Sequence, residues 1–220
     1  IQKLIFVSTC SNYGETKNSE IVNEDHYLNP LSLYAKSKVR IENFIKSKEK
    51  KVGYVPTILR FATAFGYSPR MRFDLTVNHF CYSIYKDKLI EIYDANTWRP
   101  YCHVNDFAEL ILKVLKADEK LINFQIFNAG GDQNNYKKKD IAELIAKNIP
   151  EAKIFINEKK SLDRRDYRVS FKKVQEVLNF KPSFSVEDGI NEIINVLKKD
   201  NFYLKEDALS NYGNFKILDH

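Results

Sequence analysis

The stretch NPLSLYAKSKVRIE, residues 29–42, contains a proline loop, the start of a helical pattern, and a Tyr and a Lys four residues apart. On a helix, Tyr34 and Lys38 would point to the same side. An ammonium held near a phenol stabilises the phenolate and lowers a pKa that starts near ~10, which makes a general base usable at neutral pH. The stretch therefore predicts a proton-transfer site on a helix.

Spacing alone does not identify this site, because Tyr-x-x-x-Lys occurs four times in a chain that has 13 Tyr. The other pairs begin at Tyr13, Tyr82 and Tyr212. Only Tyr34 follows a Pro-containing loop at the start of a long helical pattern, with the hydroxyl-rich residues 8–11 a short way upstream. The sequence context therefore selects Tyr34 with Lys38.

Composition indicates a soluble globular protein, because 44% of the 220 residues are hydrophobic and 29% are charged. The formal charge of +6 comes from interspersed residues of both signs, so we expect no nucleic-acid partner. The three Cys and four His have no metal-ligand or redox spacing, which indicates reduced thiols and a cytoplasmic location. No apolar run approaches the ~18 residues that span a membrane, so no membrane partner is expected.

Short apolar runs that alternate with helical patterns predict an α/β fold. Residues 4–7 and 55–61 are typical of strands buried on both faces, and the helix that starts at Tyr34 lies between them, so a parallel crossover is expected. Residues 15–30 are expected to form a polar loop. Asn105 or Asp106 is expected to cap one helix, and Ser185 the last one. Further strands are expected at 89–93, 98–104, 124–127 and 154–156, and further helices at 74–85, 107–115 and 139–148.

Five segments together make the chain recognisable, and they lie at residues 6–14 (FVSTCSNYG), 34 and 38, 59–66 (LRFATAFG), 99–106 (RPYCHVND) and 127–130 (FNAG). In these segments and in their order the chain resembles the extended short-chain dehydrogenase/reductase family, in its nucleotide-sugar epimerase and dehydratase branch. The resemblance implies the C-terminal part of a Rossmann-like parallel sheet with a smaller mixed α/β substrate-binding domain.

The resemblance also implies a division of the chain. Residues 1–66 would form the latter half of the Rossmann-like domain. Residues 67–220 would mainly form the substrate-binding part, with residues 104–130 returning to the Rossmann-like sheet. None of the seven glycines forms the Gly-x-Gly-x-x-Gly loop that holds the pyrophosphate of a dinucleotide. We therefore expect roughly one hundred further residues upstream of Ile1, by analogy with the family, and poor cofactor binding by this chain alone.

The resemblance assigns catalytic roles to three residues. Tyr34 would be the base, Lys38 would stabilise its phenolate and hold the nicotinamide ribose, and Thr9 would hydrogen-bond the reacting sugar oxygen. The implied chemistry is removal of the 4-hydroxyl proton by Tyr34 while a bound NAD or NADP takes hydride from the same carbon. In an epimerase the hydride then returns to the other face of the 4-keto sugar.

The resemblance implies a nucleotide-diphosphate sugar as the substrate. Arg99 matches the arginine that pairs with the diphosphate, a task suited to its fork of donors. Asn78 matches an asparagine that touches the same group, and Thr63 stands where many relatives have an Asn that contacts substrate. A late phosphate-binding arginine falls at Arg165 or Arg168, with Arg165 preferred.

Departures from the family pattern reduce the number of activities that we expect for this chain. Dehydratases of this branch carry an Asp-Glu pair directly after the catalytic threonine, where this chain has Cys10 and Ser11, so elimination is disfavoured. A nucleotide-sugar 4-epimerase is the leading expectation. A 4-keto-sugar reductase and a non-catalytic remnant that binds a nucleotide diphosphate or a partner remain alternatives. A homodimer formed through the Tyr34 helix is a further family expectation.

Overall fold

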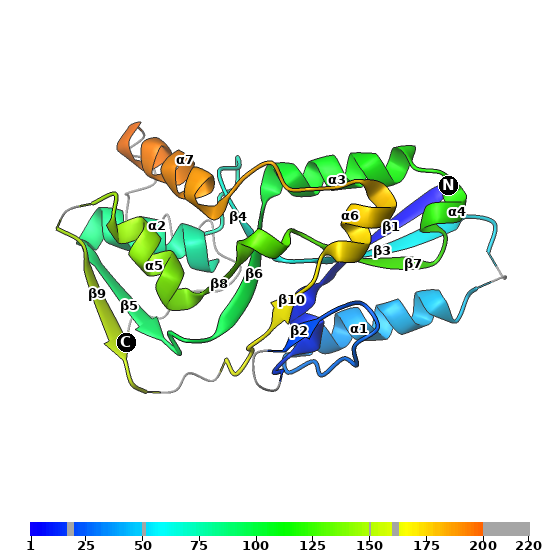
Figure 1. Cartoon of the computed structure of the whole chain (residues 1–220), viewed down its shortest axis with the longest axis horizontal. Helices are drawn as coiled ribbons and strands as arrows, with labels where there is room; N and C mark the ends of the chain where they lie inside the picture. Colours follow the sequence, from blue (N-terminus) through cyan, green and yellow to red (C-terminus); the bar gives the residue numbers. More distant parts are fainter. Residues whose placement is uncertain (17–19, 50–51, 150, 160–162, 200–220) are drawn as a thin grey trace.

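The protein has the predicted α/β fold, with parallel strands and covering helices arranged in two parts along its longest axis (Figure 1). The computed structural model describes residues 1–16, 20–49, 52–149, 151–159 and 163–199. Residues 200–220 therefore lie outside the described part of the chain.

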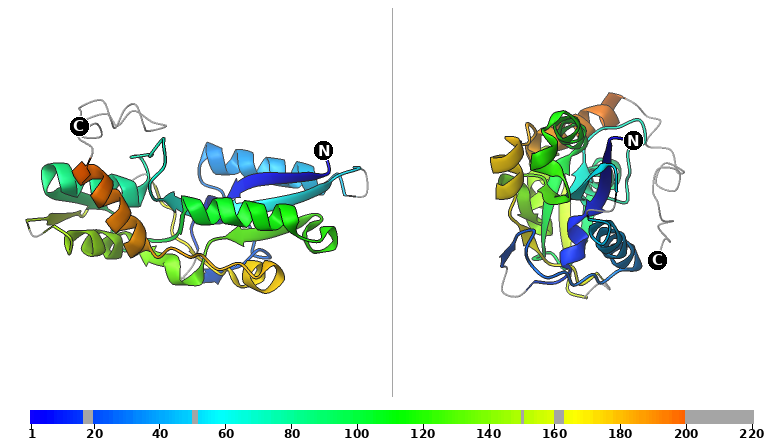
Figure 2. Two further views of the ribbon diagram at one scale, coloured as in Figure 1. Left: turned by 90° about the horizontal axis from the view of Figure 1, so that it is seen from above. Right: turned by 90° about the vertical axis from the view of Figure 1, so that its right-hand side faces the viewer.

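The main sheet contains β1 (Lys3–Thr9), β3 (Val55–Phe61) and β7 (Gln125–Ala129), all parallel and in the order β1-β3-β7. In the central strand, residues 56–60 are buried, as expected for a strand that is covered on both faces. Helix α1 (Leu33–Lys46) covers one face, and α3 (Val104–Lys116) and α6 (Lys172–Leu178) cover the other (Figures 1 and 2). The predicted parallel crossover from β1 through α1 to β3 is present.

The second part lies at the other end of the molecule, where the helices α2 (Thr76–Asp87), α5 (Lys138–Ala146) and α7 (Val186–Lys199) surround a second hydrophobic core. Two small sheets belong to it: β5 (Leu89–Tyr93) pairs in parallel with β9 (Lys153–Asn157), while β6 (Trp98–His103) lies between β4 (Thr63–Phe65) and β8 (Asn135–Lys137). The first core is built around β3, α3 and β7. The division at residue 66 remains a prediction.

Several short elements were not predicted. The expected polar loop 15–30 contains β2 (Ile21–Val22), which pairs in parallel with β10 (Arg168–Val169). The 3-10 helix η1 (Cys10–Tyr13) follows β1, and α4 (Glu119–Ile122) precedes β7. Two-residue strands carry no periodic signal in a sequence, because their pairing depends on a partner that is distant along the chain.

Helix caps refine and in one case correct the predicted boundaries. Helix α1 begins one residue before Tyr34, and its N-cap Ser32 accepts a hydrogen bond from the backbone N–H of Ala35 at 3.1 Å. The prediction that Asn105 or Asp106 caps α3 is wrong. The cap is His103, whose Nδ1 accepts the backbone N–H of Asn105. A neutral imidazole offers one acceptor nitrogen, so it can replace the usual carboxylate or amide.

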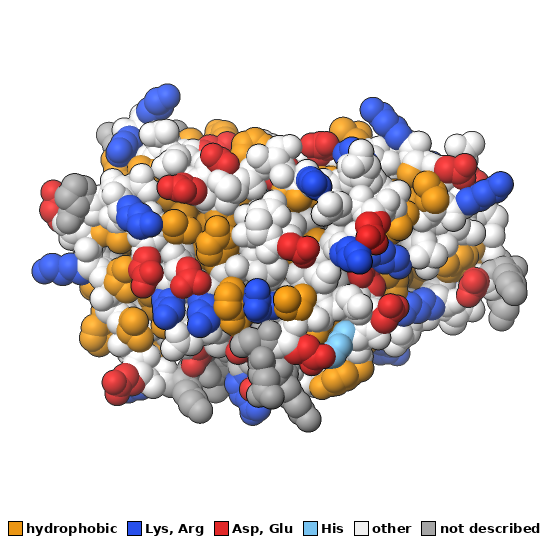
Figure 3. All heavy atoms as spheres, in the orientation of Figure 1, with side chains coloured by type: hydrophobic (Ala, Val, Ile, Leu, Met, Phe, Trp, Pro, Cys, Tyr) orange, Lys and Arg blue, Asp and Glu red, His pale blue; other side chains and the backbone are white. Residues whose placement is uncertain are grey.

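The predicted start of the last helix is confirmed. The backbone N–H of Asp188 donates to Ser185 Oγ at 3.1 Å, and the backbone N–H of Ser185 donates to Asp188 Oδ2 at 2.8 Å. These reciprocal bonds form a capping box. Along the described part of the chain, no helix combines the length and hydropathy needed to cross a membrane. Basic and acidic side chains intermingle over the face drawn in Figure 3.

Candidate active site

Thr9 is the last residue of β1, at the carboxyl end of an edge strand of the main sheet, where ligands of open α/β sheets bind. Its side chain is 8% exposed. Thr9 Oγ1 accepts a hydrogen bond from the backbone N–H of Ser11 at 3.1 Å. Because Oγ1 acts as the acceptor in this bond, the hydroxyl proton remains available for donation to a ligand.

Tyr34 and Lys38 lie on successive turns of α1, beside the end of β1. The Lys38 ammonium donates to the backbone carbonyl of Val7 at 2.7 Å and lies 5.6 Å from the centroid of the Tyr34 ring. Tyr34 is 54% exposed, so its ring faces the surface. Since Val7 precedes Thr9 by two residues on the same strand, the structure brings all three predicted catalytic residues to the carboxyl end of β1 or to the helix beside it.

Two predicted substrate-binding arginines meet at a single carboxylate. Arg165 donates to Asp163 through Nε at 2.6 Å and Nη2 at 2.7 Å, and Arg99 Nη2 lies 3.4 Å from Asp163 Oδ2. Burial pushes the pKa of Asp163 upward, but the hydrogen bonds and charge of Arg165, with the charge of Arg99, outweigh it and hold that pKa well below its usual range. The arrangement can bind an anion with two guanidinium groups.

Ser11 connects the arginines to the end of β1. Arg165 Nη1 donates to Ser11 Oγ at 3.1 Å, and the hydroxyl of Tyr167 lies 3.2 Å from the same oxygen. Ser11 in turn donates its backbone N–H to Thr9, as described above. A continuous set of polar contacts therefore runs from Thr9 to Arg99.

Cys10, at a position where the resemblance puts an acid in dehydratases, is held against the backbone of β3. Its Sγ lies 3.1 Å from the carbonyl oxygen of Arg60, and burial raises the pKa of the Cys10 thiol far above its usual value. The thiol therefore stays protonated near neutral pH.

The other predicted substrate-binding residues have different surroundings. Asn78 is 2% exposed, and its Oδ1 accepts the backbone N–H of Gly66 at 3.2 Å, so it braces the loop after β4. Thr63 is partly buried in β4, opposite Tyr101 of β6. The guanidinium of Arg168 stacks 4.4 Å above the Trp98 ring. Of the two late arginines, Arg165 is thus the one that shares Asp163 with Arg99.

The sequence reasoning missed a buried ion pair beneath this site. Arg60 Nη2 donates to Glu42 Oε2 at 2.7 Å, and the two side chains are 1% and 0% exposed. One signal was available: Arg60 sits inside the apolar run of β3, where a charge needs a buried partner. The sequence alone did not say which acid supplies it.

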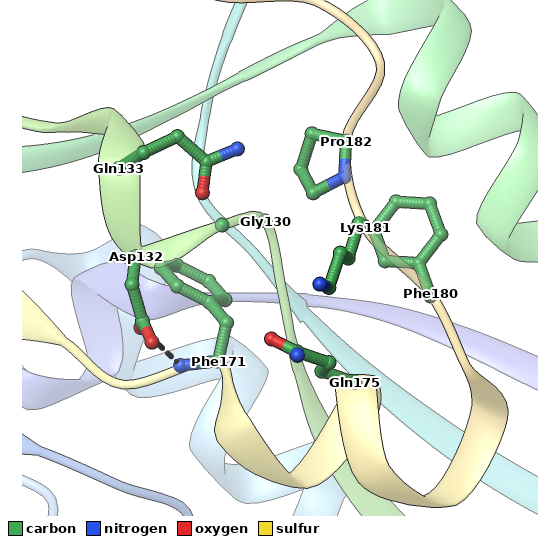
Figure 4. Close-up of a pocket in the computed structure, with 9 residues that line it drawn as sticks. Gly130, Asp132, Gln133, Phe171, Gln175, Phe180, Lys181 and Pro182 are labelled. Atoms are coloured by element: carbon green, nitrogen blue, oxygen red, sulfur yellow. Dashed lines mark hydrogen bonds between the residues drawn. The ribbon is translucent and has the colours of Figure 1, made fainter.

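A separate cavity of about 260 Å³ lies beyond the end of β7, between η3 (Asp132–Asn134) and α6. In Figure 4, the side chains of Gln133, Gln175 and Lys181 reach toward its interior, and Phe171 and Phe180 form its walls. None of the predicted site residues lines this cavity. The polar side chains that line this cavity are exposed, so it lacks the buried, fixed polar groups of a catalytic site.

Comparisons with known proteins agree with these observations. Residues 1–130 match the family described as the NAD dependent epimerase/dehydratase family. The chain is 27% identical over 205 residues to UDP-glucuronate 4-epimerase from Thermodesulfobacterium geofontis, which covers 91% of this chain and 60% of that protein. A putative UDP-glucose 4-epimerase from Methanocaldococcus jannaschii is 27% identical over 209 residues, covering 91% of this chain and 65% of that one.

Among solved structures, UDP-glucuronic acid 4-epimerase from Bacillus cereus, in complex with UDP-glucuronic acid and NAD, is similar with a TM-score of 0.78 and 26% identity. The match covers 90% of this chain and 62% of that one. UDP-glucose 4-epimerase from Thermotoga maritima, at 22% identity and a TM-score of 0.79 over 90% of this chain and 64% of that one, shares the fold. This chain thus spans about 60% of the length of the curated relatives that it matches.

Proposed function

Because the chain belongs to the NAD dependent epimerase/dehydratase family, we propose that it is a nucleotide-sugar 4-epimerase-type enzyme that acts through Tyr34, Lys38 and Thr9. The observation that carries this proposal is the position of the Lys38 ammonium, which lies 5.6 Å from the Tyr34 ring and is bound to the carbonyl of Val7. A fixed ammonium beside a surface phenol is the arrangement that a phenolate base requires.

The proton transfer is assigned to Tyr34. Its phenolate takes the proton of the sugar 4-hydroxyl during oxidation and returns a proton after the ketone has turned over. Lys38 stabilises the phenolate without leaving the backbone carbonyl that holds it, because an ammonium has three donors and Val7 uses one. Thr9 donates its hydroxyl proton to the reacting sugar oxygen, because the bond from the Ser11 N–H occupies a lone pair of Oγ1 and leaves that proton unused.

Substrate positioning is assigned to Arg99 and Arg165, which bind the diphosphate from two sides. Thr63 is assigned a contact to the substrate, and Asn78 is assigned to the diphosphate, where it also holds the loop at Gly66. This geometry suits a nucleotide-diphosphate sugar. Its diphosphate would lie at Arg99 and its reacting hydroxyl at Thr9, the two ends of the continuous polar contacts described for the site. The binding energy of the diphosphate would then place the 4-hydroxyl against the base.

The residues present fit one end of a nicotinamide cofactor, NAD or NADP. Tyr34 is half exposed and Val7, beside it, is 41% exposed, so a ribose can reach Lys38 from the surface. A bound nicotinamide would supply the oxidation and reduction at the sugar carbon. The pyrophosphate end has no glycine loop among these 220 residues, so cofactor binding by this chain alone should be weak.

Ligand binding tests the substrate assignment without requiring turnover. UDP titrated into the chain by calorimetry should bind, and Arg99→Met should weaken it by about tenfold or more, because a guanidinium bound to an anion is lost. Arg164→Met is the matched control, because the Arg164 side chain is 74% exposed and should leave affinity within about twofold. Equal affinity in wild type and Arg99→Met would contradict the diphosphate site.

Turnover tests the catalytic assignment. The enzyme with its cofactor bound should convert UDP-glucuronate and UDP-glucose, each with added NAD, to their 4-epimers. Tyr34→Phe should lower the rate by about 100-fold or more. Tyr27→Phe is the control, since Tyr27 is 65% exposed and lies outside the site. Conversion of a 4-keto sugar with consumption of a reduced cofactor would instead identify the reductase alternative. If UDP binds but no redox activity appears even with NAD bound, the chain is the non-catalytic remnant.

A further inference from the structure

The buried pair of Glu42 and Arg60 is the centre of a hydrogen-bond network beneath the site. Glu42 accepts from Arg60 Nε and Nη2, from Asn12 Nδ2 at 2.9 Å, and from Ser8 Oγ at 2.5 Å. Arg60 also donates to the Tyr13 hydroxyl at 3.0 Å, which donates to Asn128 Oδ1 at 2.7 Å. The network therefore joins β1, η1, α1, β3 and β7.

The network is connected directly to the proposed catalytic residues. Ser8 precedes Thr9 on β1, and Glu42 follows Lys38 by one turn of α1. The carbonyl of Val7 holds Lys38, and the hydroxyl of the next residue, Ser8, holds Glu42. Two consecutive residues of the strand thus hold two consecutive turns of the helix, because residues four apart lie on one side of a helix.

Apolar packing alone gives α1 a weak register on the sheet. Over its 14 residues the helix buries Ala35, Glu42 and Ile45, and the small core beneath it comprises Ile45 with Ile58 and Ile126. Packing of a few aliphatic side chains tolerates small sliding and rotation, whereas hydrogen bonds of 2.5–3.2 Å to a buried carboxylate have directional requirements. The hydrogen bonds of Glu42 therefore constrain the register of α1 more tightly than this apolar packing does.

We propose that Glu42 and Arg60 are positioning residues, which fix α1 on β1 so that Lys38 and Tyr34 stand against Thr9. This inference takes the catalytic roles of Tyr34, Lys38 and Thr9 from the proposed function. The position of α1 on β1 does not depend on that function. A buried ion pair often contributes little net stability compared with apolar side chains of similar size, while it can specify one arrangement. The pair then acts on the register of α1 more than on the stability of the chain.

The double variant Glu42→Met/Arg60→Met separates register from stability, because both charges are replaced together and neither is left uncompensated. We expect it to fold, with a lowered midpoint of thermal unfolding because the buried Ser8 hydroxyl and Asn12 amide lose their acceptor. Its crystal structure should have Lys38 Nζ out of hydrogen-bond distance of the Val7 carbonyl. Lys172→Met/Glu176→Met is the control, since that pair is exposed on α6 and should leave the Lys38 contact intact. A folded double variant that keeps the contact would overturn the proposal.

Glu42→Asp provides a second comparison if the double variant does not fold. The carboxylate is drawn back by one methylene, so α1 should shift and the Lys38 contact should lengthen while Arg60 stays paired. In the active enzyme, kcat should fall by about 100-fold with KM for the nucleotide sugar unchanged, because misplacement affects the base and not the arginines. An unchanged contact, or failure of both variants to fold, would overturn the positioning role and assign the pair to stability.

The two proposals can fail independently. The Lys38 contact is a structural measurement, so it decides the positioning role even if the chain has no turnover. Conversely, a Tyr34→Phe enzyme with full activity would contradict the proposed function while leaving the link between Glu42 and the register of α1 in place.

Discussion

The carboxylate of Asp163 accepts two hydrogen bonds from the guanidinium of Arg165, at 2.6 and 2.7 Å, in the place where the proposed diphosphate would bind. Arg99, on a different element, lies 3.4 Å from the same carboxylate. A phosphate group can likewise offer two oxygens to the paired N–H donors of a guanidinium. Asp163 is therefore an internal counter-ion, and an incoming diphosphate must share the arginines with it or displace it.

Removal of the Asp163 charge should strengthen anion binding. Asp163→Asn keeps the size of the side chain but removes a negative charge next to the proposed diphosphate, so affinity for UDP should rise by about five- to tenfold, equivalent to roughly 1 kcal/mol in a half-exposed site. Calorimetry at low and high salt measures it. Glu15→Gln, whose carboxylate pairs with Arg164 at 3.0 Å on the surface, is the control. Weaker binding by Asp163→Asn would mean that the carboxylate orients the arginines.

Substitution of Gly66 should disrupt the loop after β4. Gly66 has a φ of +106°, and an added Cβ would lie 2.1 Å from Nε2 of His103, which is completely buried. Gly66→Ala should therefore lower the free energy of unfolding by at least about 2 kcal/mol. Gly53→Ala is the matched control, since nothing lies within 4 Å of the position of its Cβ. Denaturant unfolding of both variants measures the difference, and equal stabilities would contradict the described packing of His103.

Two buried tyrosines should respond oppositely to loss of their hydroxyls. Among the described residues, Tyr82 Oη has no hydrogen-bond partner, although the side chain is 1% exposed. Tyr82→Phe should therefore raise the free energy of unfolding by about 1 kcal/mol, because a desolvated polar group is removed.

Tyr13 is the matched comparison, since it is equally buried but its hydroxyl bridges Arg60 and Asn128. Tyr13→Phe should lower the free energy of unfolding by about 1–3 kcal/mol. Thermal and denaturant unfolding of the two variants provide the test. A destabilised Tyr82→Phe variant would indicate that its hydroxyl has a partner in the protein.

The pH dependence of stability should contain an unfavourable contribution from Glu24. Burial raises the pKa of its carboxyl above the ordinary 4.5, against the lowering effect of the hydrogen bond that Glu24 accepts from the backbone N–H of Asn128. The folded chain therefore binds this proton more tightly than the unfolded chain. Stability is lost as the pH rises from about 4.5 through the raised pKa.

Glu24→Gln removes this titration while its amide oxygen can still accept the Asn128 N–H. The variant should unfold at a higher urea concentration than wild type at pH 7, and the difference should shrink as the pH approaches 4. Glu143→Gln, at an exposed position of α5, is the control. A Glu24→Gln variant less stable than wild type at pH 7 would contradict this assignment.

The sequence by itself determined the fold class and most of the regular elements, and it predicted Tyr34 as the catalytic residue among four similar pairs. Short, largely apolar stretches such as residues 55–61 indicate buried parallel strands, because a strand covered on both faces packs side chains on both. The order of five short segments predicted the family that the comparison over residues 1–130 then established. Periodicity and local order are properties that the sequence carries directly.

Tertiary structure alone decided which distant residues meet. The pairing of β2 with β10, the Asp163 carboxylate between Arg99 and Arg165, and the choice of Glu42 as the partner of Arg60 all join positions that no local pattern relates. His103 replaced the predicted cap of α3 for the same reason, since its ring is held by Phe184, stacked at a centroid distance of 4.2 Å. The partner of a buried charge or ring is a residue that folding brings within hydrogen-bond or van der Waals distance, and its position in the sequence does not reveal it.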